Sequence, residues 1–391
     1  MPAPRSTPPA RAAPEDARAL LGGVSPGTFL RADWQRRARL VRAALPGFRG
    51  PFSREALFAL AGRDDVESRL VVRNGSRWRV EHGPFTARSL GTLPARAWTL
   101  LVQGTNLVDA RADALMRRFA FVPYARLDDV MVSYAAPGGG VGPHLDSYDV
   151  FLLQGFGRRR WRWGAQRDAS FVPGLPLRIL ARFAPTHDAV LSPGDMLYLP
   201  PDVAHDGVAI DACTTYSIGF RAPAASEIGG AFLTHLAETV DLAGRYADAG
   251  PAVARQPARI PAAMRARVRR TLARIRFGPR EVDTFLGQWL TEPKPLVLFA
   301  PRAHVPSRDA FARALRRRGA RLDLATQALY DARALYINGE RVTPGAQATT
   351  SLRRFADRRS MSPVEAAALD REALELIRDW YRHGWIHHDA A

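Results

Sequence analysis

The spacing of apolar and polar residues changes character along the chain. Residues 1–22 are mostly Pro, Ala and Arg, with too few large apolar side chains to pack, so a disordered tail is predicted. Ser25-Pro26 then has the pattern of a helix start, and Ser53 of a second. The first helix is expected to bury Phe29, Trp34 and Leu40. Two apolar runs flank Asn74-Gly75, which predicts a β-hairpin.

Between residues 126 and 223 short apolar runs alternate with Gly and Pro. The runs that predict strands are 130–134, 150–153, 160–163, 196–199 and 215–220. Many short strands at such spacing are typical of an antiparallel barrel or sandwich.

After Pro223 the apolar period becomes helical. Ser226 is expected to cap one helix and Pro261 to start another. From about residue 294 the chain mixes element types. We expect a strand at 296–299, a helix between Ser307 and Gly319, a hairpin at Asn338-Gly339, and terminal helices from Ser362-Pro363. This order predicts a small α+β module with a hairpin wing.

Composition adds a basic charge to this outline. The chain has 391 residues, of which 47% are hydrophobic, and its 56 Lys+Arg against 38 Asp+Glu leave a net charge of +18. Such a charge favours an anionic partner, for example a nucleic acid or a ribonucleoprotein. The single cysteine, Cys213, excludes intramolecular disulfides and multi-Cys zinc sites. With no apolar run of the roughly 20 residues that a membrane span needs, a soluble cytoplasmic protein is expected.

One stretch carries residues suited to metal binding. His144 and Asp146 are two apart, so on an extended strand they share a face. His205 follows a Pro-Gly-Asp turn and a short strand. Two histidines and one carboxylate on one side of an ion form the facial triad of non-haem Fe(II) oxygenases. A bare His-x-Asp arises often by chance, and the Gly-rich turn and the surrounding strands are what favour a site here.

A second feature is the alternation of Arg and Trp in residues 158–163. Arg159 falls on the same strand face as Trp161 and Trp163. If the indoles point inward, so does Arg159, and a buried guanidinium needs an anionic partner. A ligand carboxylate would supply that partner, and the alternative is a solvated basic hairpin.

The run GPHLDSYDVFLLQGFGRRRWRWG, with RWRVEHGPF before it and PPDVAHDG and YSIGFRAP after it, resembles the bacterial ribosomal oxygenases. These are JmjC-type cupin proteins that use Fe(II), 2-oxoglutarate and O2 to hydroxylate an arginine in a large-subunit ribosomal protein. The similarity is strongest over residues 50–225. It implies an α+β protein, in which a double-stranded β-helix (JmjC/cupin) domain precedes dimerisation helices and a winged-helix-like C-terminal module.

The resemblance also implies roles and boundaries. His144, Asp146 and His205 would be the iron ligands and catalytic centre, and Arg159 and Ser133 would bind 2-oxoglutarate. The expected division is a tail at 1–22, an oxygenase domain at 23–225, a dimerising segment at 226–292 and the C-terminal module at 293–391. A homodimer is expected, and direct contact with nucleic acid is not required.

Four aspartates and no Arg or Lys lie between Leu127 and Gly157, an acidic island suited to a cationic substrate. Asp129 and Met131 share a strand face with Ser133, and Tyr148 shares the parity of Asp146. We therefore expect Asp129 to pair with the substrate arginine, and Met131 and Tyr148 to line its path.

Two rival interpretations stay open. One is a catalytically silent cupin that acts as a ribosome- or nucleic-acid-binding scaffold. The other is a metal-dependent cupin without redox chemistry, such as an isomerase.

Overall fold

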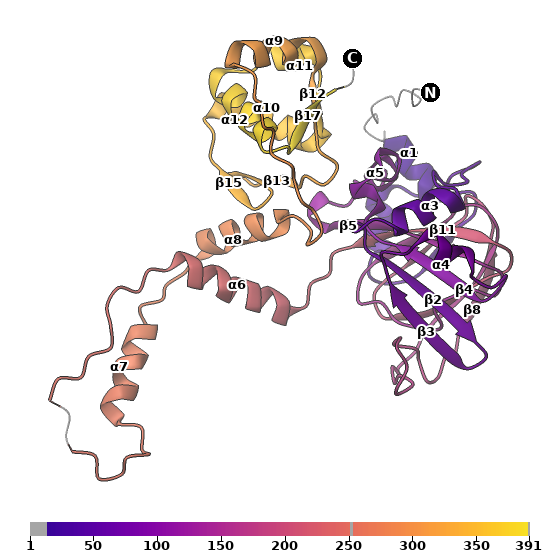
Figure 1. The fold of residues 1–391 in the computed structure, drawn as a ribbon, viewed down its shortest axis with the longest axis horizontal. Coiled ribbons are helices and arrows are strands. Elements are labelled where there is room, and N and C mark those ends of the chain that lie inside the picture. The colour runs from indigo at the N-terminus through magenta and orange to yellow at the C-terminus, as the bar shows by residue number, and fades with distance from the viewer. Residues whose placement is uncertain (1–13, 251–252, 390–391) are drawn as a thin grey trace.

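The computed structural model describes residues 14–250 and 253–389 (Figure 1). Its largest part is a barrel made of two antiparallel sheets. In sheet order, the larger sheet contains β1 (Arg39–Val41), β9 (Met196–Leu199), β6 (Val150–Gln154), β11 (Cys213–Phe220), β5 (Leu127–Ala135), β4 (Trp98–Val102), β2 (Ser68–Asn74) and β3 (Arg77–His82). The smaller sheet contains β10 (Val203–Ala209), β7 (Arg159–Ala165) and β8 (His187–Leu191). The five strands predicted between residues 126 and 223 are all present, and so is the hairpin at Asn74-Gly75.

Strand β6 explains how the two sheets share one core. Val150 and Leu152 pack with Trp161 and Trp163 of the smaller sheet. Phe151, between them, packs on the opposite face, where the N-terminal helices lie. Because both faces are buried, the strand is a continuous apolar run with no polar alternation.

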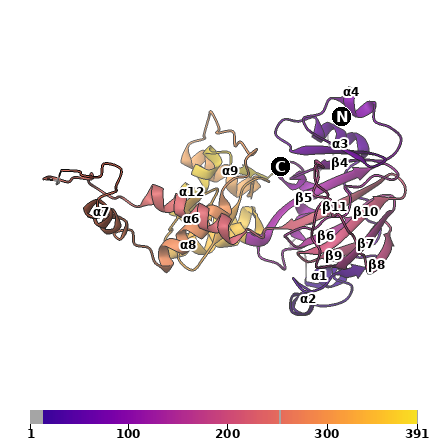
Figure 2. The same cartoon turned by 90° about the horizontal axis from the view of Figure 1, so that it is seen from below.

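The helices of the N-terminal half cover the outer face of the larger sheet (Figure 2). They are α1 (Pro14–Leu20), α2 (Pro26–Ala32), α3 (Arg54–Ala61), α4 (Ala87–Gly91) and α5 (Ala110–Arg117), with single turns η1 (Thr105–Leu107) and η2 (Tyr124–Arg126). The Ser25 and Ser53 hydroxyls accept hydrogen bonds from the first turns of α2 and α3, as their positions predict.

Two predictions for this region are wrong. The disordered tail was expected to reach residue 22, but α1 is a helix whose Leu20 is fully buried, as is Leu21 beyond it. The packing of these two leucines against the barrel stabilises a helix that the Pro/Ala-rich composition alone does not predict. Residues 1–13 of the predicted tail lie outside the described residues. The first helix also ends at Ala32, so that Leu40 belongs to β1, which pairs with β9.

A helical arm and a terminal module follow the barrel. The arm contains α6 (Ala225–Thr239), α7 (Ala262–Leu272) and α8 (Pro279–Thr291). The module contains α9 (Arg308–Arg318), β12 (Ala320–Leu322), β13 (Ala328–Tyr330), β14 (Leu335–Ile337), β15 (Glu340–Val342), α10 (Ala346–Arg358), β16 (Ser360–Met361), α11 (Pro363–Ala367), α12 (Arg371–Arg382) and β17 (Ile386–His388). Within the ranges described, no helix has the length and apolar character needed to cross a membrane.

The terminal module has the predicted winged-helix character, with one correction. Ser307 and Ser362 cap α9 and α11, and β14 and β15 form a hairpin at Asn338-Gly339. Residues 296–299 form no strand, because Leu298 is 92% exposed and no sheet edge receives the segment. Helix α6 also starts one residue before Ser226, with Ala224 at its cap position.

Candidate metal centre

Three side chains with metal-ligating atoms meet where the segment before β6 approaches β10. The backbones of His144 and His205 exchange two hydrogen bonds of 3.0 Å. The Asp146 carboxylate lies 3.5 Å from Nε2 of His205 and 3.9 Å from Nε2 of His144. One ligand atom from each residue lies within 4.8 Å of the others, so a single ion can bind all three.

Hydrogen bonds to the backbone orient both imidazoles. Nδ1 of His144 lies 2.9 Å from the Gly142 carbonyl, and Nδ1 of His205 lies 2.9 Å from the Val203 carbonyl. Because a carbonyl only accepts, each Nδ1 carries the proton and each Nε2 keeps its lone pair for a metal. Burial also lowers the pKa of His205 well below its usual value, which favours the neutral, ligating form. The donor set and its orientation therefore fit Fe(II).

The local backbone differs from the extended strand that the His-x-Asp spacing suggests. His144 forms only an isolated bridge, and Asp146 lies in an irregular segment whose carbonyl accepts from the Asp202 amide at 2.9 Å. The Gly-rich run before it packs directly on backbone. A Cβ on Gly139 would overlap the Trp98 carbonyl, and one on Gly140 would lie 2.6 Å from the Gly207 carbonyl oxygen. These glycines let the loop carrying His144 approach β4 and β10 closely.

Arg159 points into the barrel, as the strand alternation predicts. It is 4% exposed, whereas the next residue, Arg160, is exposed and pairs with Asp188. The Arg159 guanidinium donates to the Ser133 hydroxyl at 3.0 Å and the Thr215 hydroxyl at 3.2 Å, and its Nε has no partner. Among the described residues no carboxylate forms an ion pair with it, and burial lowers its pKa. A buried cation with a free donor is suited to binding an anion.

Sequence reasoning missed the polar residues that hold this cation. Thr215 of β11 is 1% exposed and donates to Oε1 of Gln154 at 3.2 Å. Gln154 is fully buried and donates in turn to the carbonyls of Phe156 and Gly157. The sequence offers one signal for this network, since Gln154 is a polar residue at the end of the apolar run of β6. Its partner Thr215 cannot be read from the sequence, because it depends on how β6 and β11 are aligned. Arg69 of β2 was also missed: burial raises the pKa of Asp146, and the charge of Arg69 is one of the weaker influences that oppose this rise.

The residues expected to meet substrate lie on the same side of the barrel. The Asp129 carboxylate accepts from the Gly104 amide at 3.0 Å, and burial together with the charge of Asp128 raises its pKa to about 6. Tyr148 is 39% exposed, and after burial the charges of Asp146 and Asp129 contribute most to raising its pKa. Met131 is half-buried opposite Ser217.

The acidic island divides into two kinds of residue. Asp149 is fully buried, accepts from the Tyr198 hydroxyl at 2.7 Å and pairs with Arg126, so it stabilises the barrel. Asp128 pairs with Lys294 and lies 3.5 Å from Arg221. Two of the four aspartates of the acidic island, Asp149 and Asp128, are therefore neutralised within the fold.

Comparisons with known proteins agree with this geometry. A JmjC domain model matches residues 114–228, a ROXA-like winged helix model matches residues 269–387, and an AraC-like ligand binding domain model matches residues 187–273. The chain is 36% identical over 275 residues to the ribosomal protein uL16 3-hydroxylase of Escherichia coli, covering 70% of this chain and 73% of that protein. It is 40% identical over 209 residues to a probable ribosomal oxygenase of Haemophilus influenzae, covering 52% of each.

Solved structures extend the likeness to nearly the whole chain. An X-ray structure of E. coli YcfD matches with a TM-score of 0.81 and 30% identity, over 94% of this chain and 98% of that one. The E. coli ribosomal oxygenase YcfD in complex with cobalt and 2-oxoglutarate matches with a TM-score of 0.78, 30% identity, and 93% and 98% coverage. With its His-Asp-His centre, buried arginine and winged-helix module, this chain belongs to the JmjC-type ribosomal oxygenase family.

Proposed function

We propose that this protein is an Fe(II)- and 2-oxoglutarate-dependent oxygenase that hydroxylates an arginine side chain of a large-subunit ribosomal protein. The observation that carries the proposal is the pairing of a three-ligand centre with a buried arginine that has no ionic partner among the residues that the structure describes. The three-ligand centre suits iron, and the buried arginine suits the distal carboxylate of 2-oxoglutarate.

We assign the roles as follows. His144 and His205 bind Fe(II) through Nε2, and Asp146 binds it through its carboxylate. Arg159 and Ser133 hold the distal carboxylate of 2-oxoglutarate. When bound, iron, 2-oxoglutarate and O2 supply the oxidising power to hydroxylate an unactivated carbon. The chain orients these groups, and Trp161 and Trp163, each about 5% exposed, keep the wall of the site dry.

The substrate arginine is proposed to enter from a crevice between the barrel and the terminal module. This crevice has a volume of about 1230 Å³ and includes Asp129 in its lining. Its six acidic residues outnumber its three Arg and Lys residues, in a chain of net charge +18. Such a lining attracts a basic segment. Asp129 would pair with the guanidinium, while Tyr148 and Met131 flank it.

We further propose a cytoplasmic homodimer formed through the arm, residues 226–292. Apolar side chains on α6 and α8 are exposed in the single chain, including Leu233 at 68%, Leu286 at 43% and Ile228 at 39%. A second copy is the occupant that would cover them, as in the dimerising helices of the family. The barrel would begin before residue 23, because α1 packs on it, and the terminal module would span 293–391.

A silent scaffold or an isomerase would not need both the intact triad and Arg159. The test is the absorption spectrum of the anaerobic Fe(II) protein with 2-oxoglutarate. We expect the weak visible band of an iron-chelated 2-oxo acid, with Arg159→Ala requiring more 2-oxoglutarate and Arg160→Ala serving as the control. Absence of the band at saturating 2-oxoglutarate would refute the cofactor assignment.

A further inference from the structure

Half of the net charge of this protein lies on one projecting segment. Residues 253–280, which we name the arginine arm, contain nine arginines and no Asp, Glu or Lys, so they contribute +9 to a total of +18. The arginine arm is the part of the helical arm that includes α7 and the loops on both sides of it. Figures 1 and 2 draw α7 at the end of the molecule farthest from the barrel.

The guanidinium groups of the arm are free to bind an external anion. All nine arginines are exposed, and within the described ranges none forms an ion pair with a carboxylate. Their contacts are with neutral groups: Arg274 donates to the Ala243 carbonyl, and Arg267 lies over the Tyr246 ring. Some exposed arginines elsewhere pair with acids, as Arg160 does with Asp188 and Arg63 with Asp65. Others in the described ranges, such as Arg313 of α9, do not, so what distinguishes the arginine arm is the density of its unpaired arginines and its lack of any acidic residue.

The apolar and basic residues of α7 occupy different sides of the helix. Met264, Val268 and Leu272 recur every four residues and form one apolar stripe. Arg267 and Arg270 of α7, continued by Arg274 just beyond its last residue, form a second stripe roughly 130° around the helix axis at 3.6 residues per turn. Arg265 and Arg269 lie on the other flank of the apolar stripe. A dimer contact through the apolar stripe would leave this basic stripe facing outward.

We propose that the arginine arm binds the phosphate backbone of RNA. This inference rests on the proposed function, because a ribosomal-protein substrate occurs beside ribosomal RNA. A density of nine unpaired guanidinium groups in 28 residues matches a polyanion better than a single small anion. The helix itself, α7, carries no aromatic side chain that could stack on bases, so the contact is expected to be independent of sequence.

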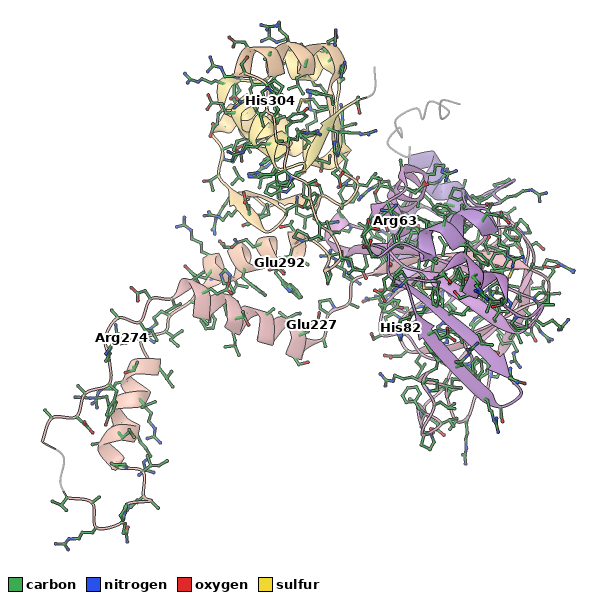
Figure 3. All side chains as sticks on the ribbon, in the orientation of Figure 1. Arg63, His82, Glu227, Arg274, Glu292 and His304 are labelled. Carbon is green, nitrogen blue, oxygen red and sulfur yellow. The ribbon has the colours of Figure 1, made fainter. Side chains whose placement is uncertain are left out.

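An anionic membrane is the competing partner for a basic amphipathic helix. The apolar stripe of α7 has three residues and no Trp or Phe, with Met264 37%, Val268 44% and Leu272 57% exposed. The one aromatic ring of the arginine arm, Phe277, lies outside α7 and is 57% exposed. Against nine arginines, three aliphatic side chains on the helix favour a polyanion over insertion into a membrane. Figure 3 labels Arg274 on the arginine arm and Arg63, which lines the crevice, and the two lie far apart, so binding at the arginine arm leaves the crevice open.

The test compares two triple variants of the full chain. Arg267→Gln, Arg270→Gln and Arg274→Gln remove the basic stripe that runs along α7 and just past its end. Arg313→Gln, Arg316→Gln and Arg317→Gln remove the same charge from α9, where these arginines are also exposed and have no ion pair among the described residues. Binding of a 20-nucleotide single-stranded RNA is followed by fluorescence anisotropy at several salt concentrations, beside vesicles of an anionic phospholipid.

We expect the arm variant to bind the RNA about tenfold or more weakly and its salt slope to fall by roughly two units, while the α9 variant changes little. Hydroxylation of a short arginine peptide should stay at the wild-type rate in both variants. Equal losses in the two variants, or binding to vesicles but not to RNA, would overturn the inference. Peptide hydroxylation without any RNA binding would also overturn it, while leaving the proposed function intact.

Discussion

Replacing Arg159 by Ala removes the buried cation that we propose binds the distal carboxylate of 2-oxoglutarate. Arg159 is 4% exposed, its guanidinium donates to Ser133, Thr215 and the Gly207 carbonyl, and its Nε–H has no partner among the described residues. A hydrogen bond to a charged group contributes about 1.5–3 kcal/mol, and removing one strands the bound carboxylate away from water. Since 1.4 kcal/mol corresponds to a factor of ten, the dissociation constant for 2-oxoglutarate should rise about tenfold to a hundredfold.

The assay is isothermal titration of the anaerobic Co(II)-loaded protein with 2-oxoglutarate, which measures binding without turnover. The matched control is Arg160→Ala, because Arg160 is the next residue on β7 but is exposed and pairs with Asp188. Affinity for Co(II) should stay near the wild-type value in both variants, since neither arginine is a proposed ligand. If Arg159→Ala and Arg160→Ala weaken 2-oxoglutarate equally, the argument from burial and strand face is wrong.

Three further predictions concern the metal, the substrate and the assembly. His144→Ala removes one of three ligands, so Co(II) affinity and succinate production should collapse while circular dichroism stays native; full succinate production would refute the triad. Asp129→Asn keeps an acceptor for the Gly104 amide but loses the charge, so peptide hydroxylation should fall far more than in Asp128→Ala. Because burial raises the pKa of Asp129 from 3.8 to about 6, the wild type loses stability as the pH rises from about 4 to 6, by about 3 kcal/mol in full above that window. Asp129→Asn should therefore resist urea better than the wild type at pH 8, with a smaller gain at pH 5, and an equal gain at both would contradict this. Leu233→Asp on α6 places a charge on a side chain that is 68% exposed in the single chain. If the proposed dimer forms, sedimentation velocity should find dimers of the wild type and monomers of Leu233→Asp, and a monomeric wild type would refute the dimer.

The elements that could be predicted from the sequence carry local signals. Ser53, Ser307 and Ser362 each accept a hydrogen bond from the first turn of the helix they precede. The alternation around Arg159 correctly gives its inward face, because a strand has a period of two whatever it pairs with.

What the sequence could not supply is the partner across the sheet. Asp149 and Asp128 look alike in the acidic island, yet both have partners within the fold. Asp149 pairs with Arg126 and accepts from the Tyr198 hydroxyl, and Asp128 pairs with Lys294. These partners come from as far as 166 residues away, and no local pattern indicates them. The same holds for Thr215, whose contact with Arg159 depends on the packing of β11 against β7.

The measurement that tests the central claim most directly is mass spectrometry of large-subunit ribosomal proteins after incubation with the purified chain, Fe(II), 2-oxoglutarate and O2. We predict the addition of one oxygen atom to an arginine of one such protein, in step with succinate formation. His144→Ala should abolish both signals. Succinate formation with no oxygen added to any arginine, or oxygen added equally by His144→Ala, would contradict the account.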